Sequence, residues 1–163
     1  MVYASLPEYV VGDVGDFLLF VSRLGQGYFD DLELAHVGPF ARFLTMFVGS
    51  KDYIRNPYLR AKFVEILAHF MPSKHGRDSN LFSAINRKPM AIEHMARSVA
   101  RYYVDIQDVD SYSRVNKRHD ACSVLTALWS HPGHRSSLVR MSMFVVFFFF
   151  FFFFFFFFFF FFF

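Results

Sequence analysis

The pattern of apolar and polar positions predicts a chain made of helices. In most segments the apolar residues recur three and four positions apart, which places them on one face of an α-helix. Strict alternation of apolar and polar residues is the pattern of a half-buried β-strand. It persists for a strand's length only in stretches that fit a helical period better. We therefore expect an all-α fold of about seven helices.

The first helix is predicted over residues 7–24. Ser5 to Glu8 has the form of a capping box with a proline in the first turn, and Gly25 offers a stop. Gly12 and Gly15 each cost about 1 kcal/mol relative to alanine, so this helix needs tertiary contacts. The apolar stripe expected to face the core is Val10, Val14, Phe17, Val21 and Leu24, widened by Val11 and Leu18.

The next two helices are each predicted to have a proline in the opening turn. One opens at Gly38-Pro39 and ends at Gly49-Ser50, and its apolar face is Phe40, Phe43, Leu44, Phe47 and Val48. The other opens after the N-cap residue Asn56 and closes at Pro72. Its expected buried face is Leu59, Phe63, Ile66, Leu67 and Phe70, with Arg60, Lys62 and Glu65 more exposed.

The second half of the chain predicts four more helices. A short one capped by Ser79 carries Leu81, Phe82 and Ile85. A longer one starts at Pro89 and buries Ile92, Met95, Ala96, Val99, Tyr103 and Ile106, and a polar loop follows over residues 107–113. A helix over residues 115–130 is expected to turn Cys122, Leu125 and Trp129 inward, and a short last helix begins at Pro132.

The spacing of these helices favours a stack over a regular repeat array. Their starting positions have no fixed period, although the loops between them are short. We therefore expect an irregular armadillo-like or HEAT-like stack of helical pairs over residues 1–140.

Composition sets the end of the chain apart from the rest. Of the 27 phenylalanines in the 163 residues, 17 form the unbroken run Phe147–Phe163. The apolar stretch 141–163 is long enough to cross a bilayer, so a tail anchor is one hypothesis. Natural spans mix several apolar residues, whereas a run of one aromatic residue is low complexity and is what a long T-tract encodes. We interpret the run as an artefact of the gene model and expect no membrane insertion.

The charge and the cysteine content exclude several other classes of protein. The net charge is +3, divided into −4 over residues 1–50 and +7 over the remainder. An anionic partner is one interpretation of this asymmetry, but the basic residues alternate with acids, so we favour solvated helix faces and expect no nucleic-acid partner. Cys122 is the only cysteine, which excludes a disulfide scaffold. The start of the chain lacks the features of a signal peptide.

Two histidine-containing motifs are candidates for chemistry, and each has a simpler structural interpretation. Cys122 follows His119 by one helical turn, so a nucleophile and base pair is conceivable; we interpret Cys122 as a small core residue. His131 and His134 flank Pro132-Gly133 without cysteine or carboxylate support for a metal, and we interpret them as a helix boundary.

Three aspartates complete the candidates. Asp105, Asp108 and Asp110 could bind a cation, but no glycine lies between them and no glutamate follows at the spacing of a calcium loop. We interpret this segment as a solvated loop. The sequence therefore predicts no catalytic, cofactor-binding or metal site, and describes a helical binding module.

Five blocks of sequence, taken together, resemble a known family. Residues 56–67 read NPYLRAKFVEIL, and the other blocks, in chain order, are residues 7–20, 40–50, 102–106 and 128–135. In this order and spacing they are similar to the core domain of the U-box ubiquitin chain-elongation factors, the ubiquitin conjugation factors of the "E-four" class. The resemblance covers residues 7–140.

The resemblance implies a role in extending ubiquitin chains on substrates bound for the proteasome. It implies a ubiquitin-conjugating enzyme, ubiquitinated substrates and a hexameric unfoldase ATPase as partners. We expect a cytoplasmic or nuclear location, because the start of the chain lacks the features of a signal peptide. The family binds the conjugating enzyme through a C-terminal U-box, which has no counterpart in this sequence. We therefore expect part of the core, an interaction scaffold inactive alone and without a cofactor; an unrelated helical scaffold is the alternative.

Overall fold

The described part of the protein consists of helices and short connections. The computed structural model describes residues 7–24, 34–49, 53–72, 79–106 and 111–143. Over these ranges there is no strand, which confirms the all-α prediction. The helices are α1 (Glu8–Leu24), α3 (Leu34–Gly49), α4 (Pro57–Phe70), α5 (Asn80–Arg87), α6 (Pro89–Asp105), α7 (Ser111–Trp129) and a last helix over residues 132–143.

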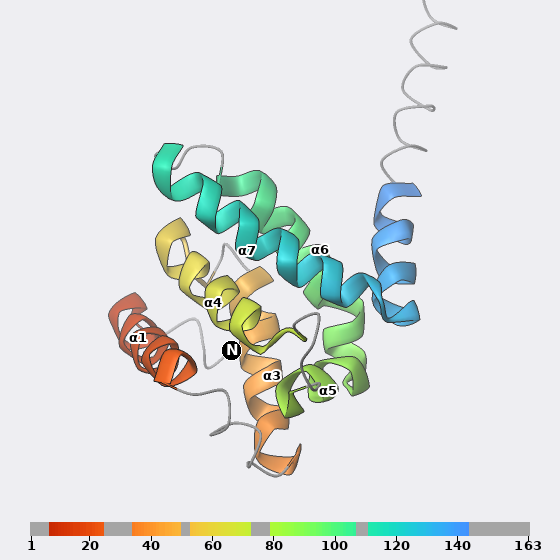
Figure 1. Ribbon diagram of the computed structural model, residues 1–163, viewed down its shortest axis with the longest axis horizontal. Helices are drawn as coiled ribbons and strands as arrows, with labels where there is room; N and C mark the ends of the chain where they lie inside the picture. The colour runs from red at the N-terminus through yellow and green to blue at the C-terminus, as the bar shows by residue number, and fades with distance from the viewer. Residues whose placement is uncertain (1–6, 25–33, 50–52, 73–78, 107–110, 144–163) are drawn as a thin grey trace, which may run out of the picture.

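The helices pack as a stack of two layers (Figure 1). One layer is the row α1, α4 and α7, in which α4 lies between the other two. In the other layer α3 packs against α6 and α5, and the layers meet where α3 contacts α4 and where α6 contacts α7. Helices from successive pairs therefore lie side by side, which confirms the predicted helical stack.

Capping residues start two helices where the sequence predicts. The Asn56 side chain accepts a hydrogen bond from the backbone N–H of Tyr58 at 2.9 Å. The Ser79 hydroxyl accepts from the N–H of Phe82 at 3.1 Å and donates to the carbonyl of Phe70 at 2.7 Å. Ser79 thus joins the end of α4 to the start of α5 while capping α5.

Two helices begin earlier than predicted. α3 begins at Leu34, so Pro39 lies inside the helix rather than at its start. The residue before it is Gly38, which has no Cβ to clash with the proline ring, so the helix can continue through this position. α7 begins at Ser111, within the predicted loop over residues 107–113. Several sequence features lie outside the described residues: Ser5, Gly25, Asp108, Asp110 and residues 144–163.

The first helix buries a different face from the predicted one. Its buried residues are Val11, Gly15, Leu19 and Ser22, whereas Phe17 and Leu24 of the predicted stripe are 65% and 63% exposed. The buried face carries a glycine and a serine, so it is less apolar than the outer face. A Cβ at Gly15 would lie 3.5 Å from the Phe63 ring, which is an ordinary van der Waals distance, so α1 packs directly on α4 at this position.

The seventh helix is also rotated relative to the prediction. Ala121, Val124 and Leu128 are buried, whereas Cys122 and Trp129 are exposed and Leu125 is half-buried. The face that is buried includes the small residue Ala121. On the same side, the ammonium of Lys117 lies 4.1 Å from the centre of the Tyr58 ring. A lysine that covers an aromatic ring does not register as apolar in a hydrophobicity pattern.

The third predicted helix, α4, has the buried face that its apolar spacing predicts. Leu59, Phe63, Ile66, Leu67 and Phe70 are all buried. The Phe63 ring lies 5.5 Å from the Phe43 ring in an edge-on contact and 6.2 Å from the Phe47 ring, measured between centroids. Phe63 therefore contacts both α3 and α1 from the centre of α4. Arg60 departs from the prediction because it is buried as well.

Phe63→Ala is expected to lower the free energy of unfolding by about 3–5 kcal/mol, because the cavity would open where three helices meet. Chemical unfolding followed by circular dichroism measures this loss. Phe17→Ala is the matched control, since the same atoms leave an exposed site, and it should change stability by no more than about 0.5 kcal/mol. Equal losses for the two variants would contradict this account of the core.

Candidate functional site

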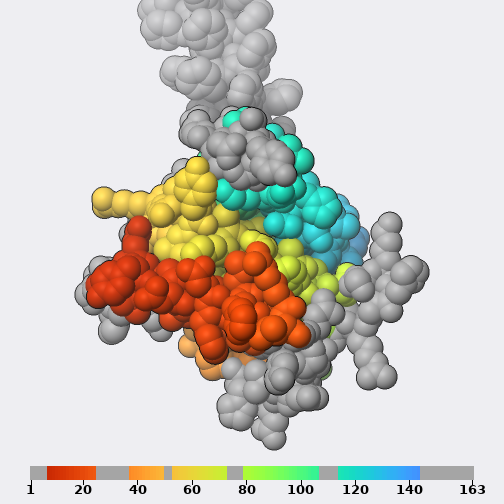
Figure 2. Space-filling model, turned by 60° about the vertical axis from the view of Figure 1, so that its left-hand side comes forward, coloured from red at the N-terminus to blue at the C-terminus, as the bar shows by residue number. Residues whose placement is uncertain are grey.

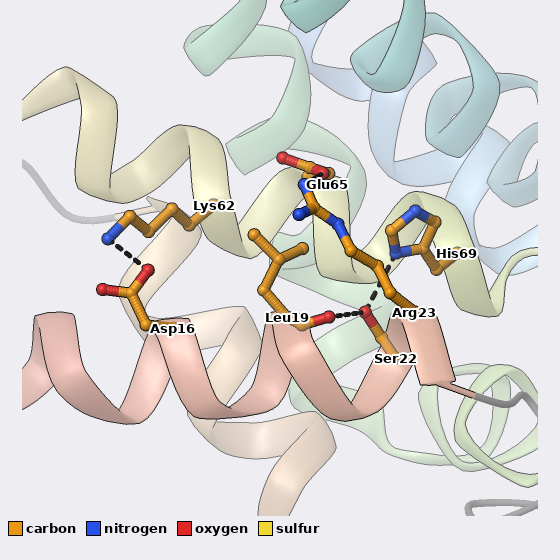
Figure 3. Close-up of polar contacts among 7 residues, drawn as sticks. All are labelled: Asp16, Leu19, Ser22, Arg23, Lys62, Glu65 and His69. Atoms are coloured by element: carbon orange, nitrogen blue, oxygen red, sulfur yellow. Dashed lines mark hydrogen bonds and ion pairs between the residues drawn. The ribbon is translucent and has the colours of Figure 1, made fainter.

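The contact between α1 and α4 carries a row of polar interactions (Figure 3). Asp16 pairs with Lys62 at 2.6 Å, and Arg23 pairs with Glu65 at 2.6 Å. Beside the Arg23–Glu65 pair, the buried Ser22 hydroxyl donates to the carbonyl of Leu19 at 2.8 Å and lies 2.9 Å from Nδ1 of His69. The two ion pairs are partly exposed and contribute little stability. Their value is geometric, because they fix how α1 lies along α4.

A second polar cluster lies on the opposite side of α4. The Arg60 guanidinium pairs with the Asp105 carboxylate at 3.1 Å, and both side chains are largely buried. The sequence predicts an exposed Arg60, since hydrophobic periodicity cannot reveal a charge neutralised by a residue 45 positions away. Removal of one partner of such a pair leaves an uncompensated buried charge, which is strongly destabilising.

Two groups in the helices around this pair have raised pKa values. Burial, followed by the charge of Asp120, raises the pKa of Tyr102. Burial, followed by the charge of Glu65, raises the pKa of Asp120. These shifts follow from desolvation and from like charges in a helical core. The groups occupy the junction of α4, α6 and α7 and support a structural role.

Cys122 lies on the outer face of α7. Its thiol is free and exposed, so the interpretation as a core residue is wrong. His119 is 81% exposed, and its Nδ1 lies 3.8 Å from the Asp120 carboxylate. A nucleophile needs a base that is held in place by further contacts. The geometry on this face supports no such assignment for the pair.

His131 and His134 mark the start of the last helix, as the sequence predicts. Nδ1 of His131 accepts a hydrogen bond from the N–H of Gly133 at 3.2 Å, so the ring caps this helix, a role that the sequence analysis missed. The rings of His131 and His134 lie 5.4 Å apart. Within the described residues, no three histidine, cysteine or acidic side chains are grouped to hold a metal ion, and Asp105 is bound to Arg60.

His134 is fully buried beneath this cap. Neither of its ring nitrogens makes a well-formed hydrogen bond in the described structure, although the backbone of Ile92 lies close to the ring. The adjacent turn packs tightly on α6, since a Cβ at Gly133 would lie 2.7 Å from Cγ2 of Ile92. Burial, followed by the charge of His131, lowers the pKa of His134 from 6.5 to about 4. The ring is therefore neutral at physiological pH.

Large apolar side chains are exposed at the ends of the α1–α4–α7 row. Figure 2 shows α1 lying across the front of the molecule beside α4. Its outer face exposes Tyr9, Val14, Phe17, Phe20 and Leu24. At the other end of the row, Val115 and Trp129 are exposed on α7, and Val139 and Met143 on the last helix. In the described ranges, no helix combines the length and the apolarity that crossing a membrane requires.

Comparison with known proteins assigns these helices to a family. The family model described as "Ubiquitin elongating factor core" matches residues 1–156. The chain belongs to the ubiquitin elongating factor core family. This match confirms the resemblance that the sequence blocks carry, and it replaces the alternative of an unrelated helical scaffold.

Curated relatives of this elongating factor core chain carry matching names. It is 33% identical over 146 residues to the probable ubiquitin conjugation factor E4 of Arabidopsis thaliana. It is 27% identical over 140 residues to ubiquitin conjugation factor E4 of Schizosaccharomyces pombe, and 30% identical over 148 residues to ubiquitin conjugation factor E4 A of Bos taurus. These alignments cover 87%, 83% and 83% of the chain, but 14% of each relative's length. No solved structure matches significantly.

Stability is expected to fall by up to about 3 kcal/mol as the pH drops from 6.5 to about 4, because of His134. Its folded-state pKa lies below its unfolded value, so the folded chain binds fewer protons in this window. The contribution is complete above pH 6.5 and is lost as the pH falls. Unfolding measured at several pH values should show a shallower acid slope for His134→Leu than for the unsubstituted chain.

The exposed His94 supplies the control for this pH dependence. His94→Gln removes one histidine without altering the core, so its slope should match that of the unsubstituted chain. The raised pKa of Asp120 acts with the opposite sign and is present in all three proteins, so comparison of the slopes isolates His134. Identical slopes for His134→Leu and the unsubstituted chain would contradict the prediction.

Proposed function

We propose that this chain forms a scaffold section of a ubiquitin chain-elongation factor. The match to the ubiquitin elongating factor core over residues 1–156 carries the proposal. The helical stack suits such a role, because packed helices hold distant surfaces at fixed separations. In this proposal the section acts in extending ubiquitin chains on proteins destined for degradation, in the cytoplasm or the nucleus.

The outer face of α1 supports a place within a larger assembly. α1 packs on α4 through one face and exposes the large apolar side chains Phe17, Phe20 and Leu24 on another. A cluster of exposed apolar side chains is typical of a surface that binds another protein segment. The chain also spans 14% of the length of its relatives. Both observations support further helices of an elongation factor packing against α1.

The proposed partners follow from the family. We propose that the assembled factor acts with a ubiquitin-conjugating enzyme, with ubiquitinated substrates and with a hexameric unfoldase ATPase. Docking of the conjugating enzyme is assigned to a U-box, and none of the helices described above is given that role. The contribution of this section is positional, since ligases of this kind hold the charged conjugating enzyme close to the growing chain.

The chain alone is expected not to extend ubiquitin chains when supplied with activating enzyme, conjugating enzyme, ubiquitin and ATP. The physical reason is that the exposed Cys122 lacks a fixed base. Gel analysis of ubiquitin products measures the outcome. Chain growth that depends on this protein and disappears in Cys122→Ala would show that the thiol is a nucleophile.

A chimera tests the scaffold role directly. We expect the fission yeast conjugation factor to retain ubiquitin chain elongation when its matching section is replaced by residues 1–140 of this chain. The matched control carries Phe63→Ala in the exchanged section, which should reduce elongation by lowering the stability of the stack. A chimera that is folded by circular dichroism yet fails to extend chains would overturn the proposal.

A further inference from the structure

A groove runs along the junction of α3 and α6, on a surface that the proposed scaffold role does not use. It consists of two adjoining hollows of about 330 and 290 Å³, and both are lined by Met46. The first hollow also contacts Arg42 and Lys88, and the second contacts Met90, Arg97 and Arg101. We refer to these six residues as the α3–α6 groove.

Among the described residues, the charge of the α3–α6 groove has one sign. The ionised side chains that line it there are Arg42, Lys88, Arg97 and Arg101, and no described aspartate or glutamate lines either hollow. Like charges gathered in a depression create a positive potential that attracts anionic groups. The groove therefore selects for a partner that brings negative charge.

In the described part of the chain, the cations of the groove are not paired with carboxylates, in contrast with those of the α4 surface. Within the described residues, Arg42, Lys88 and Arg101 form no ion pair, and Arg97 donates to the backbone carbonyl of Ser137 at 3.3 Å. Around α4, by comparison, Arg23, Arg60 and Lys62 each pair with a carboxylate. The groove cations therefore have no carboxylate partner among the described residues.

The lining of the groove is apolar between these cations. Met46 lies at the point that the hollows share, and Phe43 and Phe47 line the first of them beside it. Met90 is exposed at the second. Methionine is flexible and polarisable, so it adapts to apolar side chains of varied shape. Each hollow is large enough to admit an apolar side chain, and the cations around it are placed to attract carboxylates of a partner.

We propose that the α3–α6 groove binds an acidic protein segment that carries apolar anchor residues. Such a segment matches both features, since its carboxylates meet the four cations and its apolar side chains fill the two hollows. A nucleic acid would satisfy the cations alone and would leave its phosphates against methionine and phenylalanine. The groove lies on α3 and α6, away from the α1 face assigned above to scaffold packing.

Fluorescence polarisation with a synthetic peptide tests this assignment. The probe is a labelled peptide with leucines three and four positions apart and glutamates at the positions between them. The protein is the full chain fused to a soluble carrier. We expect saturable binding that weakens as salt is added. The double variant Arg42→Glu, Arg101→Glu should weaken binding by ~10-fold or more, because it replaces attraction with repulsion at both hollows.

Matched controls separate the groove from general basicity. Arg140→Glu makes the same kind of change at an exposed site outside the groove and should alter affinity by less than about twofold. A peptide with serine in place of leucine should bind more weakly, as should the unaltered peptide to Met90→Ser. Circular dichroism confirms that each variant is folded.

Three outcomes would overturn the proposal. One is binding that the Arg42→Glu, Arg101→Glu variant leaves unchanged. Another is equal affinity for the leucine and serine peptides. A third is tighter binding of a single-stranded oligonucleotide or of anionic lipid vesicles than of the acidic peptide, which would assign the groove to phosphate. None of these readouts depends on ubiquitin chain elongation, so failure here is distinct from failure of the scaffold role.

Discussion

The packing of the Phe63 ring of α4 against both α3 and α1 is the constraint on which the stack depends. The ring projects from the centre of α4, contacts Phe43 and Phe47 of α3, and lies against the backbone of α1 at Gly15. Aromatic rings bury a large apolar area, so one residue can fix the relative positions of several elements. The layer containing α1 and α4 is thereby joined to the layer containing α3, and the ion pairs around α4 set direction rather than supply the main stability.

How well the sequence predicts the buried face of a helix depends on the kind of residue that forms the interface. The buried face of α4 is made of large apolar residues at helical spacing, and it was predicted correctly. α1 and α7 were assigned the wrong face, since their true interfaces use Gly15, Ser22 and Ala121, which a hydrophobicity pattern undervalues. Small residues permit close approach, and that benefit is visible only once the neighbouring helix is in place.

Polar features were harder to predict than apolar ones. The Arg60–Asp105 pair and the grouping of cations along the α3–α6 groove both join positions far apart in the chain. Periodicity is a local property, so it carries no information on such partners. The family resemblance was accessible, because five ordered blocks specify a family even where they do not specify a site. Membership of the family is therefore predictable from the sequence, whereas the arrangement of charged residues on the surface required the fold.

The exposed apolar face of α1 has a thermodynamic consequence. α1 contains glycines at positions 12 and 15, packs mainly on α4 and leaves one apolar face in water, so it should open locally before the core unfolds. Opening of α1 would expose the Phe63 ring. Any helix that covers the outer face of α1 binds the closed form alone, and it therefore stabilises the interior of the stack by mass action. Assembly at this surface and integrity of the core are a single linked equilibrium.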